Sequence, residues 1–144
     1  MFGTHILLSI RKGAIRRMER QTVSPTGRPA PTSPYSWGTR AGNLVFTSGH
    51  VGTDAAGKVP ADIRDQTRNC IEGCRAVLEA AGSGLQHVLK VTVFLTDMKE
   101  FAAMNEVYRA AFPASALPAR STVEVSALAR PDLRVEIEMT GCIP

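Results

Sequence analysis

Residues 133–140 limit the fold more than any other part of the chain. Apolar and polar residues alternate along this segment, in the order Leu-Arg-Val-Glu-Ile-Glu-Met-Thr. Successive side chains of a β-strand point to opposite faces, so the segment predicts a strand with one apolar and one polar face. A sheet of such strands needs helices on its apolar face, which favours an α+β sandwich.

Two segments have the residue spacing of amphipathic helices. The first follows Asp62, a typical N-cap residue, and ends at Gly82. The second follows Asp97 and ends before Pro113. One face of the second helix carries Phe101, Met104, Tyr108, Ala111 and Phe112. Both helices are expected to pack on the apolar face of the sheet.

Five segments rich in β-forming residues complete the pattern. They are residues 33–40, 44–48, 88–96, 120–125 and 133–140. The expected order is ββαβαββ, a single sheet with two helices on one face. The proline-rich residues 22–34 are expected to form a lead-in loop before any regular structure, and residues 51–60 to form a second loop.

A chain of 144 residues is typical of one domain. We assign residues 23–144 to that domain and residues 1–22 to an N-terminal extension or a start site placed too early. The apolar run at residues 5–10 is far shorter than the about 20 residues that a membrane-spanning helix needs. Basic residues follow this run rather than precede it, unlike in a secretory signal. An organelle-targeting segment is the alternative for this extension.

The basic excess of the chain is confined to its first 20 residues. That segment has five Arg and Lys residues against one Glu, whereas residues 21–144 have twelve basic and twelve acidic residues. With only 6% aromatic residues, the neutral domain lacks the basic surface and stacking platforms that nucleic-acid binding needs. We therefore expect neither nucleic acid nor a membrane as a partner.

Three cysteines, Cys70, Cys74 and Cys142, make an odd number without a CxxC pair. This pattern argues against a disulfide framework and against a zinc site. Cys70 and Cys74 have the spacing of neighbours on one helix face, and we expect them to be buried. Reduced cysteines favour an intracellular, cytoplasmic protein. No sequence motif for a metal or a phosphate-bearing cofactor occurs, so we expect neither.

Polar residues gather at the ends of the expected strands. They are Tyr35, Ser48, Gly49, His50, Asn105, Arg120, Ser121, Thr122 and Glu136. Arg120 begins a strand, where its guanidinium could hold a carboxylate through two parallel hydrogen bonds. The alternative for Arg120 is an ion pair on the surface.

Several of these residues lie in motifs that resemble the reactive-intermediate deaminases (RidA/YjgF). The resemblance runs from about residue 33 to residue 141. Its motifs are Pro34-Tyr35-Ser36, residues 42–49 (GNLVFTSG), Gln66-Thr67, residues 92–97 (TVFLTD), residues 105–108 (NEVY), residues 118–121 (PARS) and residues 135–138 (VEIE). The last two motifs reproduce the family signature, including the spacing from arginine to glutamate.

The resemblance implies a chorismate-mutase-like fold and a homotrimer with a central barrel and active sites between subunits. It implies hydrolytic deamination, without a cofactor, of 2-imino acids and their enamine tautomers to 2-oxo acids and ammonia. Substrates of this type include 2-iminopropanoate and 2-iminobutanoate. The mixed polar and apolar residues on the second face of the sheet fit such an association between copies.

By the same resemblance, three residues carry the reaction. Arg120 binds the substrate carboxylate, Glu136 activates the attacking water, and Tyr35 orients the substrate or the water. The residues expected to bind substrate are Thr122 through its backbone N–H, Gly49, Asn105, Ser48 and Trp37. The alternative for Glu136 is an ion pair with Arg134 or Arg120. For Tyr35 the alternative is a place in the core, and for Asn105 it is a helix-end or intersubunit hydrogen bond.

Three positions depart from the common family pattern. Thr122 stands where many members have cysteine, His50 where glutamine is usual, and Trp37 where glutamine is often found. These departures concern the choice of substrate more than the reaction. Other functions stay open: deamination of a different enamine such as 2-aminomuconate, and a non-catalytic trimeric module that binds 2-oxo or amino acids. The neutral domain disfavours a third, endoribonuclease activity.

Overall fold

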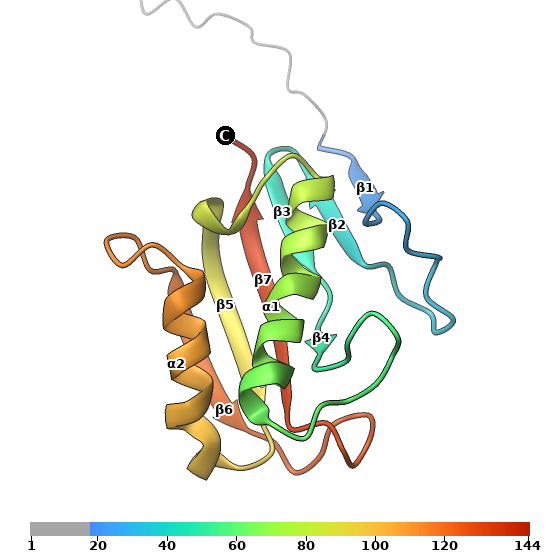
Figure 1. The fold of residues 1–144 in the computed structure, drawn as a ribbon. Coiled ribbons are helices and arrows are strands. Elements are labelled where there is room, and N and C mark those ends of the chain that lie inside the picture. The colour runs from blue at the N-terminus through green and yellow to red at the C-terminus, as the bar shows by residue number, and fades with distance from the viewer. Residues whose placement is uncertain (1–17) are drawn as a thin grey trace, which may run out of the picture.

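The structure, a computed structural model, describes residues 18–144 and contains one mixed sheet with two helices on one face (Figure 1). Its strands are β1 (Arg20–Val23), β2 (Gly38–Ala41), β3 (Leu44–Thr47), β4 (His50–Val51), β5 (Val88–Leu95), β6 (Ala119–Glu124) and β7 (Val135–Cys142). Its helices are α1 (Ile63–Ala80) and α2 (Phe101–Ala111), with short 3₁₀ turns η1 (Leu85–His87) and η2 (Met98–Glu100). The α+β class and the two helices on one face are confirmed.

The strands follow the order β1-β2-β3-β7-β5-β6, and β4 pairs with β7. All neighbours are antiparallel except β5 and β6, which are parallel and are joined through α2. A parallel pair needs such a crossover, because the chain must return to the same end of the sheet. Because β6 is the last strand in the order, it is an edge strand, and α2 lies beside it over the sheet (Figure 1).

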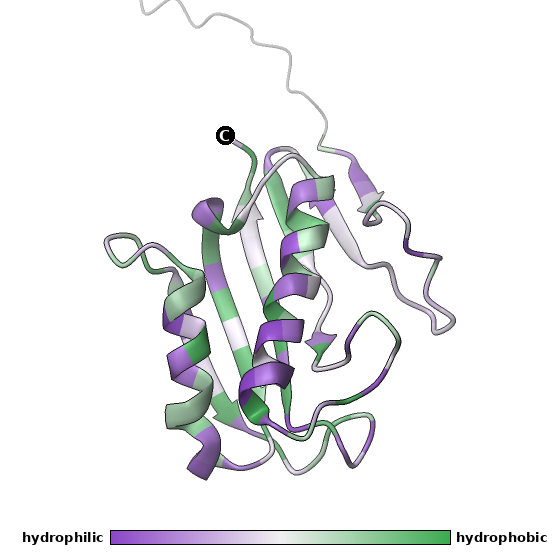
Figure 2. Cartoon of the chain, viewed as in Figure 1, coloured by the Kyte–Doolittle hydropathy of each residue, from purple (hydrophilic) through white to green (hydrophobic). Residues whose placement is uncertain are grey.

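The alternation along β7 sorts its side chains as the sequence predicts. Val135, Ile137 and Met139 are buried, whereas Glu136 and Glu138 are half-buried on the other face. Figure 2 shows the mixed hydropathy of the strands and the apolar stripes of the helices that cover them. The helix-covered face of the sheet therefore holds the core, and the open face carries the carboxylates.

Helix α1 begins and ends at the expected residues. The Asp62 carboxylate accepts a hydrogen bond from the backbone N–H of Arg64 at 2.8 Å, and Gly82 has a φ of 84° after the last turn. Gly73 lets this helix approach β4, because a Cβ there would lie 2.4 Å from Nδ1 of His50. The helix and the strand that holds His50 are thus in direct contact.

The buried Gln66 of α1 fastens the loops at one end of the sheet. Its amide nitrogen donates to the carbonyls of Pro60 and Asp132, and its amide oxygen accepts from the N–H of Arg134. A buried amide is tolerated where its hydrogen bonds are made. Gln66 therefore holds the chain in place just before β7.

Two expectations for the N-terminal part of the domain are wrong. Regular structure begins before residue 34, because β1 pairs with β2 along its whole length. Three residues of β1, 20–22, were assigned to the extension, yet they belong to the sheet. The segment RQTV has a single buried residue, Val23, so it carries no hydrophobic periodicity to reveal it. Residues 1–17 of the extension lie outside the described residues.

Several strand bounds also differ from the prediction. β2 begins at Gly38 rather than at residue 33, since the chain around Pro34 is irregular. The two-residue strand β4 lies where a loop was expected to begin, and β7 starts at Val135 and continues to Cys142. None of the helices in residues 18–144 is long and apolar enough to cross a membrane. Cys70 and Cys74 are buried and free, as expected.

Candidate active site

Arg120 lies on the helix-covered side of β6 and is held by neutral groups of α2. Its Nη1 donates to Oδ1 of Asn105 at 2.7 Å. The guanidinium carbon lies 4.5 Å from the ring centre of Tyr108 and 5.6 Å from that of Phe101. Within residues 18–144, no carboxylate lies within ion-pair distance of this guanidinium. The alternative of a surface ion pair for Arg120 is therefore wrong for this part of the chain. Its positive charge is therefore oriented but not neutralised.

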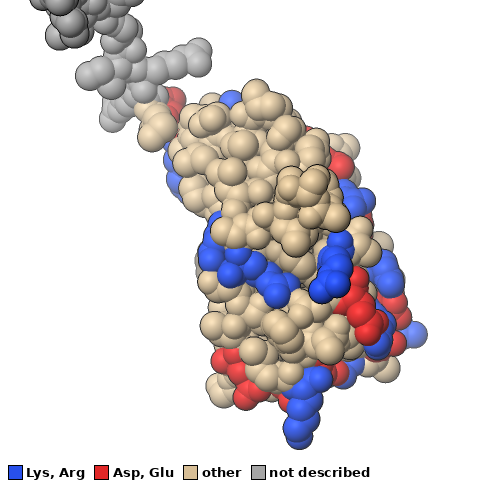
Figure 3. Space-filling view, turned by 90° about the vertical axis from the view of Figure 1, so that its left-hand side faces the viewer, with Lys and Arg blue, Asp and Glu red and all other residues tan. Residues whose placement is uncertain are grey.

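A cavity of about 270 Å³ opens at this guanidinium. It is lined by Asn105, Tyr108, Arg109, Leu117, Pro118 and Arg120. Burial raises the pKa of the Tyr108 phenol, with Arg120 acting in the opposite direction, so the hydroxyl stays neutral at ordinary pH. Figure 3 shows the side of the molecule on which α2 lies, where basic side chains cross a largely uncharged surface and acidic side chains lie next to some of them. The cavity suits a small anion.

Glu136 lies on the open face of the sheet, against Gly49. A Cβ at position 49 would lie 1.9 Å from Oε1 of Glu136, so only glycine leaves room for this carboxyl group. Burial, and then the charge of Glu138, raise the pKa of Glu136 above its ordinary value. Arg134 pairs with Glu100 instead, and no basic group of residues 18–144 forms an ion pair with Glu136. The alternative of an Arg134 or Arg120 ion pair is therefore wrong for this part of the chain.

Three aromatic rings stack next to Gly49, the residue that Glu136 lies against. They belong to Tyr35, Trp37 and His50. The Tyr35 ring meets the Trp37 indole edge-on at 5.7 Å, and the indole stacks on His50 at 5.7 Å. The indole N–H donates to the carbonyl of Pro29 at 3.0 Å. Tyr35 is 47% exposed, so its alternative place in the core is wrong. Burial, aided by Arg28, lowers the pKa of His50 to about 4, so its imidazole is neutral near pH 7.

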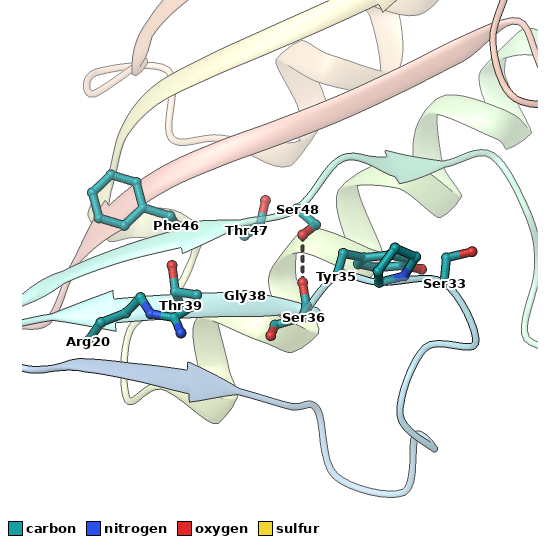
Figure 4. A pocket seen from close by; sticks show the side chains of 10 residues that line it. Arg20, Ser33, Tyr35, Ser36, Gly38, Thr39, Phe46, Thr47 and Ser48 are labelled. Atoms are coloured by element: carbon teal, nitrogen blue, oxygen red, sulfur yellow. Dashed lines mark hydrogen bonds between the residues drawn. The ribbon is translucent and has the colours of Figure 1, made fainter.

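A second cavity, of about 480 Å³, runs along β2 and β3 from Tyr35 (Figure 4). Its polar lining includes Ser33, Tyr35, Ser36, Thr39 and Ser48. Ser48 donates its hydroxyl hydrogen to the carbonyl of Ser36 at 2.6 Å, which fixes the turn that leads into Gly49. Figure 4 shows Tyr35 at one end of this cavity and Phe46 at the other.

The predicted site residues therefore fall into two groups. We call Arg120, Asn105 and Tyr108 the guanidinium half-site, and Glu136, Gly49 and Tyr35 the carboxylate half-site. Arg120 pairs with Val91 of β5, whereas Glu136 pairs with Phe94. Because residues an odd number apart on a strand point to opposite faces, the two half-sites lie on opposite sides of the sheet. One copy of the chain does not bring them together.

The remaining expected site residues lie close to one half-site each. Ser48 precedes Gly49, and Trp37 supports Tyr35. Thr122 follows Arg120 on the same face of the edge strand, and its hydroxyl is buried without a hydrogen-bond partner among the described groups. Within residues 18–144, no cluster of three His, Cys, Asp or Glu side chains could hold a metal ion.

Sequence reasoning missed the contacts of Tyr108 and Phe101 with Arg120 and the place of Arg109 in the cavity. The first two were placed on the apolar face of their helix, and that prediction is confirmed, since Tyr108 is buried and the partly buried Phe101 packs against the core. Phe101, Asn105 and Tyr108 follow one another at the four- and three-residue spacing of a helix face. That spacing, with a polar residue between two aromatic ones, is the signal that could have identified a support for a guanidinium.

Comparisons with known proteins agree with this architecture. The family model described as endoribonuclease L-PSP matches residues 25–143. A RutC family protein of Pyrococcus horikoshii is 46% identical over 121 residues, which cover 83% of this chain and 94% of that protein. The 2-iminobutanoate/2-iminopropanoate deaminase of Escherichia coli K12 is 38% identical over 121 residues, covering 82% of this chain and 94% of the enzyme.

Solved structures of related proteins have the same fold. The crystal structure of Escherichia coli TdcF with bound serine superposes with a TM-score of 0.77 at 35% identity, covering 85% of this chain and 98% of that chain. The structure of a yeast protein, YEO7, gives a TM-score of 0.81 at 33% identity, covering 88% of this chain and all of that chain. The family model covers most of the domain, and the resemblance to the RidA/YjgF proteins is confirmed. The chain belongs to the endoribonuclease L-PSP family, the family of the reactive-intermediate deaminases.

Proposed function

We propose that this protein hydrolyses 2-imino acids, and their enamine tautomers, to 2-oxo acids and ammonia. The observation that carries the proposal is the state of Glu136: a half-buried carboxyl group, seated against Gly49, with a raised pKa and no cation paired with it among the described residues. One relative, 38% identical over 121 residues, is named a 2-iminobutanoate/2-iminopropanoate deaminase. 2-Iminopropanoate and 2-iminobutanoate are therefore the first substrates to test.

In the proposed reaction, Arg120 holds the substrate carboxylate with two parallel hydrogen bonds. Asn105 and Tyr108 fix the guanidinium from behind, so Asn105 acts as a positioning residue. β6 is an edge strand, and its outward N–H groups are free of β5. The N–H of Thr122 adds a further hydrogen bond to the same carboxylate.

Glu136 performs the proton transfer in this proposal. Water attacks C2 of the protonated imine, and Glu136 accepts a proton from that water as the C–O bond forms. Glu136 then gives this proton to the nitrogen and takes up the remaining hydroxyl proton as the C–N bond breaks and the C=O bond forms, which releases ammonia and leaves the 2-oxo acid. Tyr35 orients the water or the substrate, and Ser48, Gly49 and Trp37 shape the cleft on this side.

The two half-sites can act on one substrate only if they come from different copies of the chain. We therefore propose a homotrimer, closed around its axis, in which the guanidinium half-site of one copy faces the carboxylate half-site of the next. The open face of the sheet offers an apolar surface for such contact, since Phe46 is 42% and Val123 43% exposed there. The proposed trimer has a mass of about 46 kDa, three times the 15.5 kDa of the chain.

The test is ammonia release from imines generated by an amino-acid oxidase from L-alanine and L-2-aminobutyrate. Purified protein should accelerate release beyond the uncatalysed rate, and Glu136→Gln should remove most of that acceleration. Binding of 2-oxobutanoate without any acceleration would instead support the non-catalytic binding module. Failure of both binding and turnover would overturn the proposal.

A further inference from the structure

We infer that Arg109 selects substrates with a second carboxylate, so that 2-imino dicarboxylic acids are the preferred substrate class. The inference rests on the proposed function, because it places the first carboxylate of the substrate on Arg120. It adds a residue that the family motifs do not contain.

Two guanidinium groups and no carboxylate line this cavity. Arg109 and Arg120 contribute the charges, and the other lining residues are Asn105, Tyr108, Leu117 and Pro118. Two like charges at one small cavity repel each other unless an anion lies between them. The lining therefore suits a ligand that carries more than one negative charge.

The arginines of α1 are different. Arg64, Arg68 and Arg75 each lie within 4 Å of a carboxylate, so their charges are neutralised locally. Within residues 18–144, neither Arg109 nor Arg120 takes part in such a pair. The two arginines of the cavity therefore keep their charges unpaired within the described residues, and Arg109 does so at an exposed position.

The neighbourhood of Arg109 leaves its guanidinium available. Glu106, three residues earlier on α2, is well placed to pair with Arg109. It is bound instead by Nε of Arg64 at 2.8 Å. Arg109 follows Asn105 by four residues, so both lie on one face of α2. Arg109 also lies in the last turn of α2, where the helix dipole stabilises any cation. The dipole does not explain why Arg109 lines a cavity that contains no acidic residue.

The shape of the cavity gives the order of groups in the ligand. Arg120, the second residue of β6, holds the carboxylate next to C2. Leu117, Pro118 and the Tyr108 ring supply apolar walls for methylene groups. Arg109 then receives the distal carboxylate. Substrates with an uncharged side chain leave Arg109 in water, so they bind without this added contact.

The experiment compares ligands that differ in the second carboxylate. Calorimetry measures binding of 2-oxoglutarate and 2-oxobutanoate to the wild type, to Arg109→Gln and to Arg75→Gln. The Arg75 variant removes an equal charge from α1, outside the cavity. We expect the wild type to bind 2-oxoglutarate about tenfold more tightly than 2-oxobutanoate, because a charge-assisted hydrogen bond is added. Arg109→Gln should abolish this difference by weakening 2-oxoglutarate binding far more than 2-oxobutanoate binding, and Arg75→Gln should retain the difference.

Turnover gives the second readout. Imines generated from L-glutamate and L-alanine should show the same preference in kcat/KM, and Arg109→Gln should remove it. Equal binding of both 2-oxo acids by the wild type, or equal weakening of both by Arg109→Gln, would overturn the role of Arg109. If no imine is hydrolysed, the proposed reaction fails, while the two binding constants still decide whether Arg109 recognises a second carboxylate.

Discussion

The guanidinium half-site and the carboxylate half-site differ in charge and in the way their central side chain is held. Arg120 is fixed by an amide and two aromatic rings, which orient it and leave its charge free. Glu136 is fixed by the absence of a side chain at Gly49, and burial raises its pKa. The first arrangement suits binding of an anion, and the second suits acceptance of a proton.

Their separation across the sheet has a consequence for assembly. A single sheet with helices on one face can carry a binding group on the covered side of its edge strand and a base on its open side. Both groups then reach one substrate only at a contact between copies. Catalysis in this account therefore depends on the oligomer, whereas folding of the core depends on side chains that lie between the sheet and the helices.

Removal of Arg120 should have the largest effect, on both imine turnover and ligand binding. Arg120→Ala removes the charge that holds the carboxylate, so imine turnover should be abolished. Binding of 2-oxobutanoate should weaken by about 1.5–3 kcal/mol, the typical value of a charge-assisted hydrogen bond. Arg120→Lys should restore only part of the binding, because an ammonium lacks the planar fork. Calorimetry measures both variants, and wild-type affinity in Arg120→Ala would contradict the role of the guanidinium half-site.

The opposite half-site should respond differently to a matched change. Glu136→Gln keeps the size of the side chain but removes the base, so kcat should fall on the order of 10²-fold or more. Binding of 2-oxobutanoate should stay close to that of the wild type. Steady-state ammonia release and calorimetry give the two values. If the variant turned over imines normally, Glu136 would be structural.

The pH dependence should sharpen the same contrast. Glu136 accepts a proton only when it is ionised, so kcat/KM should fall as the pH drops through its raised pKa. Because the charge of Glu138 contributes to that rise, Glu138→Gln should move the acid limb of the profile to lower pH. The measurement is kcat/KM against pH for both proteins. An acid limb at the same pH in both would show that Glu138 does not influence the base.

The smallest effect is expected at Thr122, beside the guanidinium half-site. Its hydroxyl is buried without a partner among the described groups, while its proposed contact to substrate uses the backbone. Thr122→Val should therefore raise the free energy of unfolding by about 1 kcal/mol, because an unsatisfied polar group is removed. Activity should stay within about twofold of the wild type, a smaller change than the loss of a hydrogen bond to substrate would cause. Urea unfolding and ammonia release check both values, and a large loss of activity would show that the hydroxyl itself takes part.

The sequence predicts the core of the fold because its signals are local. The alternation along β7 and the caps of α1 at Asp62 and Gly82 need no knowledge of distant residues. β1 and β4 escape prediction because they are short and carry too few apolar residues to show a period. Their pairing is decided by the strands next to them.

The candidate site divides in the same way. Arg120 and Glu136 could be chosen from motifs that lie within short segments of the chain. The contact of Asn105 with Arg120 and the close approach of Gly49 to Glu136 join segments that are distant in the sequence. Asn105 thus supports Arg120 and also lines the cavity at its guanidinium. The place of Arg109 in the same cavity could not be predicted from a motif, because the cavity is formed by two separate segments, α2 and residues 117–120.

The central claim, that the two half-sites of one active site come from different copies, is tested by mixing two inactive variants. Arg120→Ala and Glu136→Gln are unfolded together and refolded at equal amounts, and ammonia release is compared with that of each variant refolded alone. In a closed trimer with random mixing, about one cleft in four combines an intact Arg120 with an intact Glu136 from the neighbouring copy. The account predicts about a quarter of the wild-type activity in the mixture. Activity no higher than that of the separate variants, in a mixture shown by light scattering to have reassembled, would contradict it.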